Sequence, residues 1–160
     1  MSAVLMAIYL VRHAVAVGRS SWHHADDKRP LTAKGERQSR ALLRLLDGAD
    51  VRRILSSPAV RCRETVAPLA TAHRLDVRDV LDLAEGHGAR KVVDLMEELA
   101  AKRGDSVLCT HGDLVPEVLR RLARDGVRLE SELQFAKGST WELLVEDDAI
   151  VRGRYHPPAE

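Results

Sequence analysis

Three separate segments of the sequence carry imidazole or guanidinium groups that could bind an anion. They are Arg12-His13, Arg61 and His111. An unprotonated imidazole nitrogen is a nucleophile near neutral pH, and a guanidinium group can form two parallel hydrogen bonds with one anion. An Arg-His pair has little meaning alone in a chain with seven His residues. Together, the three segments predict an anion site that contains a candidate histidine nucleophile.

The three groups share one kind of placement, because each follows a stretch with the pattern of a buried strand. The predicted strands span 7–11, 51–56 and 106–110. In an open α/β sheet, ligands gather beyond the carboxyl ends of the strands. Ser57-Pro58 predicts a helix start capped by Ser57, which puts Arg61 in or beside the first turn. A cation there opposes the helix macrodipole unless an anion is bound nearby.

Each group also has a structural explanation that involves no ligand. His13 and His111 could be core histidines whose ring nitrogens bond to backbone carbonyls, a common arrangement at strand ends. Arg61 could be an exposed helical arginine. We favour the anion site because all three of these explanations would have to hold at once.

Helical and strand patterns alternate along the rest of the chain. A helix opens at Pro30-Leu31-Thr32, where Thr32 can cap it, and Gly48 ends it. The other predicted elements are a strand from Leu75 to Leu81, helices over 90–102 and 114–124, and a hairpin of 140–145 with 149–154. Pro68 should kink or end the helix that follows Ser57-Pro58. The alternation predicts a three-layer α/β domain.

Length and composition favour one globular domain. Of the 160 residues, 45% are hydrophobic and 31% are charged, a mix that supports a single core. We predict one domain over 1–155 and a frayed tail over 156–160. The longest apolar run, Ala3 to Val11, is too short to cross a bilayer and indicates a buried strand, so we expect no membrane association. Cys62 and Cys109 lack metal-ligand spacing and are expected to be structural thiols in a reducing cytoplasm.

Other partners and chemistries are disfavoured. A net charge of +1 and only five aromatic residues argue against nucleic-acid binding and favour a small anionic substrate. His and Asp in the stretch from Trp22 to Asp27 could ligate a metal, but adjacent residues rarely point at one ion, so we expect no metal and no organic cofactor. A cysteine phosphatase loop needs an Arg six positions after its Cys, and neither Cys62 nor Cys109 has one. The chain also has no Asp-x-Asp pair, Walker loop or Nudix box, which leaves histidine chemistry.

Three motifs resemble the signature blocks of the histidine phosphatase superfamily, also called phosphoglycerate-mutase-like. They are Leu10-Val11-Arg12-His13-Ala14, Ser56-Ser57-Pro58-Ala59-Val60-Arg61 with Thr65, and Thr110-His111-Gly112. Pro30-Leu31-Thr32-Ala33-Lys34-Gly35 is similar to the family's helix-opening segment. Small bacterial phosphohistidine phosphatases look most similar, together with the phosphatase half of two-domain Nudix nucleotide-sanitation enzymes. The second likeness comes from Gly18-Arg19-Ser20-Ser21-Trp22 and Lys137-Gly138-Ser139-Thr140-Trp141.

The resemblance implies a three-layer α/β/α sandwich with a mainly parallel central sheet, and a phosphatase that needs no metal. It makes His13 the nucleophile that becomes a phosphohistidine, while Arg12, Arg61 and His111 hold the transferring phosphoryl oxygens. These residue types suit phosphoryl transfer, which needs an in-line nucleophile and cations on the equatorial oxygens. The imidazole is an adequate nucleophile provided that its other nitrogen donates to a backbone carbonyl or similar acceptor.

The family also uses an acidic residue that protonates the leaving group, and Glu85 lies in the expected interval. His87 is a rival acid, and a solvent-facing loop glutamate explains Glu85 equally well. If neither acts, the enzyme favours groups that leave easily, such as phosphate, diphosphate or imidazole. Arg19 and Ser20 are candidate phosphate contacts. Trp22 is either a lid or base-stacking residue or an ordinary packed loop residue.

The sequence therefore predicts a metal-independent phosphatase for a small phosphate anhydride or ester, with a nucleotide favoured. A protein phosphohistidine phosphatase is the alternative. A catalytically silent phosphate-binding module is a minor alternative, because Arg12, His13, Arg61 and His111 are all present. A mutase is disfavoured because the chain is too short for a large cap. The oligomeric state and the pathway stay open.

Overall fold

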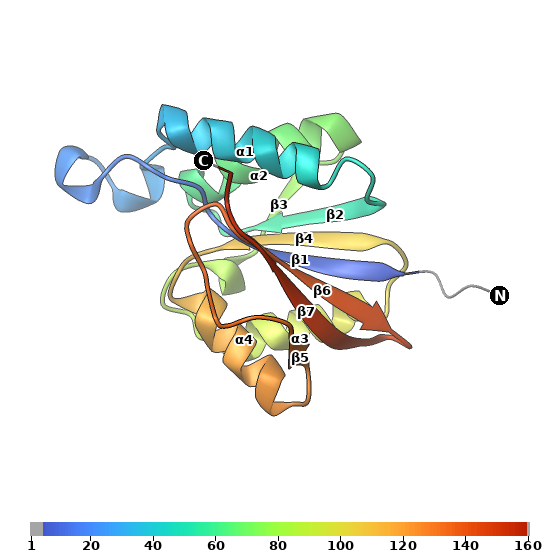
Figure 1. Ribbon diagram of the computed structural model, residues 1–160. Coiled ribbons are helices and arrows are strands. Elements are labelled where there is room, and N and C mark those ends of the chain that lie inside the picture. Colours follow the sequence, from blue (N-terminus) through green and yellow to red (C-terminus); the bar gives the residue numbers. More distant parts are fainter. Residues whose placement is uncertain (1–4, 160) are drawn as a thin grey trace.

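A seven-stranded sheet forms the middle layer of the computed structural model, which describes residues 5–159 (Figure 1). The strands are β1 (Met6–Arg12), β2 (Val51–Ser56), β3 (Val77–Asp79), β4 (Asp105–Thr110), β5 (Arg128–Leu129), β6 (Thr140–Glu146) and β7 (Ala149–His156). Their order in the sheet is β3-β2-β4-β1-β6-β7-β5. Strand β6 runs antiparallel to β1 and β7, while the other neighbouring pairs are parallel. The predicted mainly parallel sheet is confirmed.

Four α-helices cover the two faces of this sheet. They are α1 (Ala33–Leu45), α2 (Val60–His73), α3 (Ala89–Ala100) and α4 (Leu114–Arg124), and short 3-10 turns lie at Arg19–Ser21, Asp26–Lys28 and Leu81–Leu83. Figure 1 shows α1 and α2 on one side of the sheet and α3 and α4 on the other. The three-layer α/β/α sandwich is therefore confirmed. None of the helices within residues 5–159 is long and apolar enough to span a membrane.

The alternation of side chains along β1 explains why both faces are covered. Ala7, Tyr9 and Val11 belong to the core under α1 and α2. Ile8 and Leu10 belong to the core under α3 and α4. Successive residues of a strand point to opposite faces, so a strand that is apolar at every position must be buried on both sides.

The start of α1 is fixed against the loop that follows β1. The Thr32 hydroxyl oxygen accepts the Gly35 N–H at 3.1 Å, which confirms Thr32 as the predicted cap. A Cβ atom at Gly35 would lie 2.0 Å from the carbonyl oxygen of Val15. Only glycine allows this close approach, so Gly35 sets how tightly α1 packs beside the β1 loop.

The start of α2 differs from the prediction. Its N-cap is Ala59, which makes no side-chain cap bond, so Ser57 is not the cap. The Ser57 hydroxyl instead lies 2.8 Å from Nε2 of His111 and accepts the Ala59 N–H at 3.3 Å. The hydroxyl is thus engaged by the imidazole rather than by the first free amides of the helix. Arg61 is the second residue of α2, as predicted.

Pro68 lies inside α2, and the helix continues beyond it to His73. A helix end at Pro68 is therefore wrong. Val66 and Leu69 on either side of Pro68 are both fully buried in the core. Tertiary packing of this kind supplies most of the stability of a helix in a protein and can offset the hydrogen bond that proline removes.

The ends of the sheet also differ from the sequence prediction. Strand β3 covers only three residues of the stretch from Leu75 to Leu81, because it lies at the sheet edge and pairs with β2 alone. Strand β7 runs to His156, one residue into the predicted frayed tail. His156 pairs with Thr140, and its Nε2 lies 2.8 Å from Glu142. Residues 3 and 4 of the long apolar run, and residue 160 of the tail, lie outside the described residues.

Candidate active site

The carboxyl ends of three neighbouring strands bring the sequence-predicted groups together. Strand β1 lies beside β4 with Arg12 opposite Thr110, and β4 lies beside β2 with Cys109 opposite Ser56. The backbone N–H of His13 donates to the Thr110 carbonyl at 3.0 Å. The segments that follow β1, β2 and β4 therefore leave the sheet at one edge, where the parallel strand ends place them side by side.

His13 is held in one orientation by its own backbone neighbour. Its Nδ1 lies 2.8 Å from the carbonyl oxygen of Ala14, and because a carbonyl only accepts, Nδ1 carries the proton. Nε2 then keeps its lone pair. The side chain is 6% exposed. Burial lowers the pKa of His13 from 6.5 to about 3, the Ala14 hydrogen bond opposes this, and the charges of His111, Arg61 and Arg12 add to it, so the imidazole is neutral at neutral pH.

His111 lies next to His13, with a distance of 5.4 Å between the ring centroids. Its Nε2 lies 2.8 Å from the Ser57 hydroxyl, and its Nδ1 lies 3.4 Å from Nη2 of Arg61. Guanidinium nitrogens only donate, so Nδ1 accepts and Nε2 donates to Ser57. The ring is 1% exposed. Ser57 is thus a positioning residue for His111, a role that the sequence analysis missed because Ser57 was taken as a helix cap.

Arg61 is almost completely buried, with 1% of its surface exposed. Its Nη1 donates to the carbonyl oxygen of Asp26 at 2.9 Å. Its Nη2 lies 3.2 Å from a carboxylate oxygen of Asp26 and 3.4 Å from one of Glu85. The predicted explanation of Arg61 as an exposed helical arginine is wrong. A buried cation needs compensating anions and acceptors, and two carboxylates supply part of that need.

Arg12 is held on the other side of the site by Phe135. Its Nη1 donates to the Phe135 carbonyl at 2.7 Å, and its guanidinium carbon lies 5.6 Å from the centroid of the Phe135 ring. Burial lowers the pKa of Arg12 from its usual value. A Cβ atom at Gly112 would lie 2.5 Å from Nη2 of Arg12. The glycine after His111 therefore makes the room that the guanidinium occupies.

Thr65 connects two of the three motifs. Its hydroxyl oxygen accepts the Ala14 N–H at 2.9 Å, and the hydroxyl donates to the Arg61 carbonyl at 2.7 Å. These two bonds fasten the backbone after His13 to the first turn of α2. The position of His13 relative to Arg61 is thus set by a buried side chain of α2, the helix that also carries Arg61.

Two guanidinium nitrogens in this region have unused hydrogen-bonding capacity. Nε of Arg12 and Nε of Arg61 are buried, and neither finds an acceptor among residues 5–159. Buried polar atoms in proteins are nearly always hydrogen-bonded. An anion bound between these two arginines would supply acceptors of the missing kind, so the geometry fits a phosphate-like group.

The mouth of the site carries two carboxylates and one exposed cation. A cavity of about 230 Å³ is lined partly by Asp26, Arg61, Glu85 and His111. Arg19 joins the carboxylates, since its Nη2 lies 3.2 Å from Glu85 and its Nε lies 3.7 Å from Asp26. Burial acts to raise the pKa of Asp26, but the Arg29 hydrogen bond and the neighbouring guanidinium charges outweigh it and lower that pKa. The sequence analysis missed Asp26 because its loop looked like solvated surface.

The remaining candidate residues lie at different distances from the site. Glu85 Oε1 lies 3.7 Å from Nδ1 of His111, so Glu85 belongs to the mouth of the site. His87 lines a different groove, beside α3 and α4. Ser20 is exposed, and the indole N–H of Trp22 donates to the Ala25 carbonyl at 3.0 Å. Within residues 5–159, neither Ser20 nor Trp22 makes a hydrogen bond to the site.

The two cysteines and the loop from Trp22 to Asp27 are the other candidates for chemistry in the chain. Cys62 and Cys109 are free and buried. Sγ of Cys62 lies 3.5 Å from Nε2 of His111, so this thiol packs against the imidazole. Across the described part of the chain, no three His, Cys, Asp or Glu residues are grouped so that they could hold a metal ion.

Comparisons with known proteins find a matching family and a similar enzyme. The sequence model of the Histidine phosphatase superfamily (branch 1) matches residues 8–90. Over 157 residues, the chain is 31% identical to an 8-oxo-(d)GTP phosphatase of Mycolicibacterium smegmatis. The match covers 96% of this chain but 48% of the relative, so the chain spans about half the length of that protein.

Solved structures show the same fold. The protein histidine phosphatase SixA complexed with tungstate has a TM-score of 0.76 at 19% identity, with 97% of each chain covered. A Nakamurella multipartitia protein described as a phosphohistidine phosphatase of the SixA type has a TM-score of 0.69 at 26% identity, with 99% of this chain and 97% of that chain covered. At 19% identity, the likeness to the SixA structure with tungstate shows the fold alone.

Proposed function

The chain belongs to branch 1 of the histidine phosphatase superfamily, and from this membership we propose that it is a metal-independent phosphatase that acts through a phosphohistidine on His13. The observation that supports the nucleophile best is the hydrogen bond of 2.8 Å between Nδ1 of His13 and the Ala14 carbonyl. This bond leaves the Nε2 lone pair free. A pKa of about 3 keeps the imidazole unprotonated at physiological pH.

In the first step, Nε2 of His13 attacks the phosphorus atom and forms an N–P bond. The bond between phosphorus and the leaving oxygen breaks, its electron pair stays on that oxygen, and a carboxylic acid of the site gives the oxygen a proton. In the second step, water attacks the phosphohistidine, the N–P bond breaks and its electron pair returns to Nε2. Inorganic phosphate leaves, and the water proton passes to the base that served as acid in the first step.

Arg12 and Arg61 would stabilise the charge on the equatorial oxygens during both steps. His111 would join them with a proton on Nδ1, the nitrogen that accepts from Arg61 in this structure. Their side chains are fixed by Phe135, Asp26 and Ser57, respectively. Preorganised donors of this kind cost no reorganisation when charge develops, which makes them effective in a site that excludes water. The unused Nε atoms of Arg12 and Arg61 add two donors that only a bound anion would satisfy.

We propose Glu85 as the acid that protonates the leaving group. It lies 3.4 Å from Arg61 and 3.7 Å from His111, so a phosphoryl group held by these residues would lie beside the carboxylate. The Glu85 side chain is 42% exposed, so water also reaches the leaving group beside it. We therefore expect weak acid assistance and a preference for groups that leave easily. His87 is not proposed as the acid because it lines the groove beside α3 and α4.

We favour a nucleotide anhydride as the substrate. The supporting observation is that the 31% identical relative, an 8-oxo-(d)GTP phosphatase, aligns with 96% of this chain. An exposed Arg19 at the mouth of the site is placed to contact a second phosphate of such a substrate. Ser20 and Trp22 follow Arg19 in the same loop and are kept as candidate contacts of the nucleoside. We expect the enzyme to act in the cytoplasm because both thiols are free and buried.

A phosphohistidine protein is the second candidate substrate. It is favoured by the 26% identical protein that is described as a phosphohistidine phosphatase and that matches the chain over nearly its full length. It is also consistent with the exposed Glu85 at the mouth, because an imidazole leaving group needs less acid assistance than an alkoxide does. The two candidates share the same phosphohistidine chemistry on His13.

Phosphate release with EDTA present tests the proposal. Wild type and His13→Ala are compared on nucleoside triphosphates that include 8-oxo-dGTP, on sugar phosphates and on a phosphohistidine protein. We expect turnover that His13→Ala reduces by about 10⁴-fold or more, as loss of a nucleophile does in other hydrolases. Activity that survives in His13→Ala, or that requires a metal ion, would contradict the proposal. The best substrate of the panel distinguishes the two candidates.

A further inference from the structure

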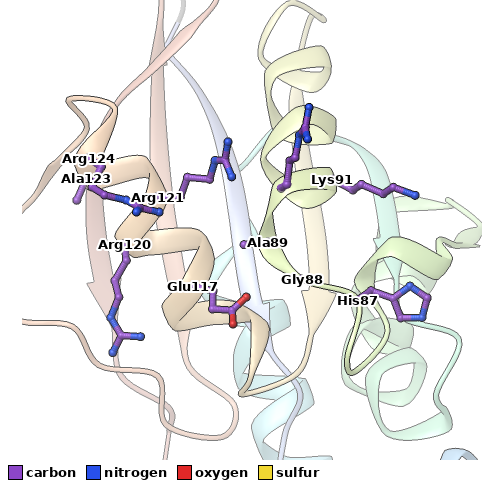
Figure 2. A pocket seen from close by; sticks show the side chains of 10 residues that line it. His87, Gly88, Ala89, Lys91, Glu117, Arg120, Arg121, Ala123 and Arg124 are labelled. Atoms are coloured by element: carbon purple, nitrogen blue, oxygen red, sulfur yellow. The ribbon is translucent and has the colours of Figure 1, made fainter.

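A groove of about 790 Å³ lies between the start of α3 and the length of α4 (Figure 2). Figure 2 shows His87 coming from the segment that leads into α3, Ala89 and Lys91 coming from the first turn of α3, and Glu117, Arg120, Arg121 and Arg124 coming from α4. Five of the lining residues are cationic and one is anionic: Arg90, Lys91, Arg120, Arg121 and Arg124, with Glu117. We call this surface the α3–α4 groove.

The cations of the α3–α4 groove have no anionic partner. Among residues 5–159, none of the five forms an ion pair, whereas arginines elsewhere in the chain, such as Arg29, Arg63 and Arg154, are paired with carboxylates. Five positive charges against one negative charge is a strong excess in a chain whose net charge is +1. Such a cluster raises the local concentration of anionic partners.

Helix stability accounts for some of these cations and not for others. Arg121 and Arg124 lie in the last turn of α4, where positive charge is favourable. Arg120 and Arg124 are four residues apart on α4, where like charges repel. Arg90 and Lys91 lie in the first turn of α3, where positive charge opposes the macrodipole, and that turn contains no acidic residue. Helix stability therefore does not account for Arg90 and Lys91, whereas an anionic ligand in the groove would be favoured by all five cations.

The α3–α4 groove begins close to the mouth of the active site. The Gly86 N–H donates to a carboxylate oxygen of Asp113 at 2.9 Å, which fastens the loop to the start of α4. Glu85 precedes Gly86 and faces Arg61, while His87 follows Gly86 and lines the groove. A ligand in the groove would thus lie next to the loop that carries the proposed acid.

The lining residues favour a peptide over a uniformly charged polymer. The small apolar side chains of Ala89 and Ala123 lie between the cations, and the lining contains no aromatic residue on which a base could stack. Glu117 would repel a nucleic-acid backbone or a polyphosphate chain, whereas a peptide can place a backbone N–H or a neutral side chain opposite it. A lining that is partly apolar and mostly cationic fits acidic side chains interspersed with apolar ones.

We propose that the α3–α4 groove is a docking site for an acidic, partly apolar segment of a partner protein. The partner binds beside the mouth of the active site, and its carboxylates pair with the arginines of α4 and with Arg90 and Lys91 of α3. This binding does not depend on the catalytic chemistry proposed above, since no groove residue takes part in phosphoryl transfer.

Fluorescence anisotropy with a labelled peptide of Glu-Leu-Glu-Glu repeats tests the proposal on the full chain. The groove variant is Arg120→Glu/Arg124→Glu. The matched control is Arg37→Glu/Arg40→Glu, which makes the same change in net charge on exposed residues of α1, across the sheet. We expect the groove variant to weaken peptide binding by about tenfold or more, because attraction becomes repulsion at two positions, and the control to change it by less than about twofold.

Equal weakening by the two variants would overturn the proposal, because net charge rather than the groove would then decide binding. Failure of the wild-type chain to bind the peptide, or binding of duplex DNA or inorganic polyphosphate in preference to it, would also overturn it. Arg120→Gln/Arg124→Gln serves as a milder variant if the reversal impairs folding. Amide NMR shifts on peptide addition should concentrate at Ala89 and Ala123, and shifts that appear only on α1 would contradict the groove.

Discussion

The candidate active site and the α3–α4 groove both depend on arginine, but they place it in opposite surroundings. Arg61 is 1% exposed and bonded to Asp26 and Glu85. Arg120 and Arg124 are exposed and unpaired within the described chain. A buried, fixed guanidinium acts through its geometry, because its donors are aimed at one place. An exposed one acts mainly through its charge, which water and salt screen.

Replacing arginine by lysine should have the largest effect that distinguishes a guanidinium acting through its geometry from one acting through its charge. We expect Arg61→Lys to lower kcat by about 10²- to 10³-fold, because an ammonium keeps the charge but loses the forked donors that a preorganised site needs. Arg120→Lys should change the affinity for the acidic peptide by less than about twofold, since the charge stays in place. Steady-state phosphate release and peptide anisotropy measure the two effects.

Arg37→Lys on α1 is the control for the catalytic measurement and should leave kcat unchanged. If Arg61→Lys is also close to wild type, the buried arginine acts as a simple charge and the contrast between the two regions fails. If Arg120→Lys abolishes peptide binding, the groove requires the geometry of its guanidinium groups and is not the charge-driven surface described above.

Gly112→Ala probes how narrowly Arg12 is placed. The added Cβ would lie 2.5 Å from Nη2 of Arg12, so the guanidinium must shift, and a shift of about 1 Å at a reacting site can cost about 10²-fold in rate. Gly48→Ala is the matched control because a Cβ there meets nothing within 4 Å. Phosphate release should fall in Gly112→Ala and stay at the wild-type rate in Gly48→Ala. Equal rates in both variants would show that Arg12 needs no fixed position.

The stability of the fold should depend on pH through His13. The pKa of His13 is about 3 in the folded chain, below its ordinary value of 6.5. The unfolded chain therefore binds a proton more readily, so the contribution of this group is fully present above pH 6.5 and is lost as the pH falls toward 3.

Between pH 8 and pH 5, this one group should cost about 2 kcal/mol of unfolding free energy in wild type. Urea unfolding of wild type and His13→Gln at both pH values measures the difference. The wild type should lose about 2 kcal/mol more stability than the variant over that interval. The same loss in both proteins would mean that His13 is not held neutral by burial.

Much of this arrangement could be predicted from residue pattern. The alternation of helices and strands predicted the three layers, and the strand-end positions of His13 and His111 predicted that they would meet. These features depend on short stretches of sequence and on general rules of α/β sheets. Because these features depend on local pattern, they could be predicted from a single sequence.

Features that depend on contacts between distant segments could not be predicted. Asp26 reaches Arg61 across 35 positions, and nothing in its polar loop distinguishes it from solvated surface. Ser57 bonds to His111 rather than capping a helix, and the Ala14 carbonyl that orients His13 is a backbone group without a sequence signal. The burial that turns Arg61 from a surface cation into a site residue likewise arises only after packing.

Trapping the phosphoenzyme tests the central claim most directly. The chain is mixed briefly with 8-oxo-dGTP that is radiolabelled in its terminal phosphate, quenched in alkali to preserve phosphohistidine, digested and analysed by mass spectrometry. The account predicts label on Nε2 of His13 in wild type and none in His13→Ala. Label on His111, or turnover with no labelled His13 at any time point, would contradict it.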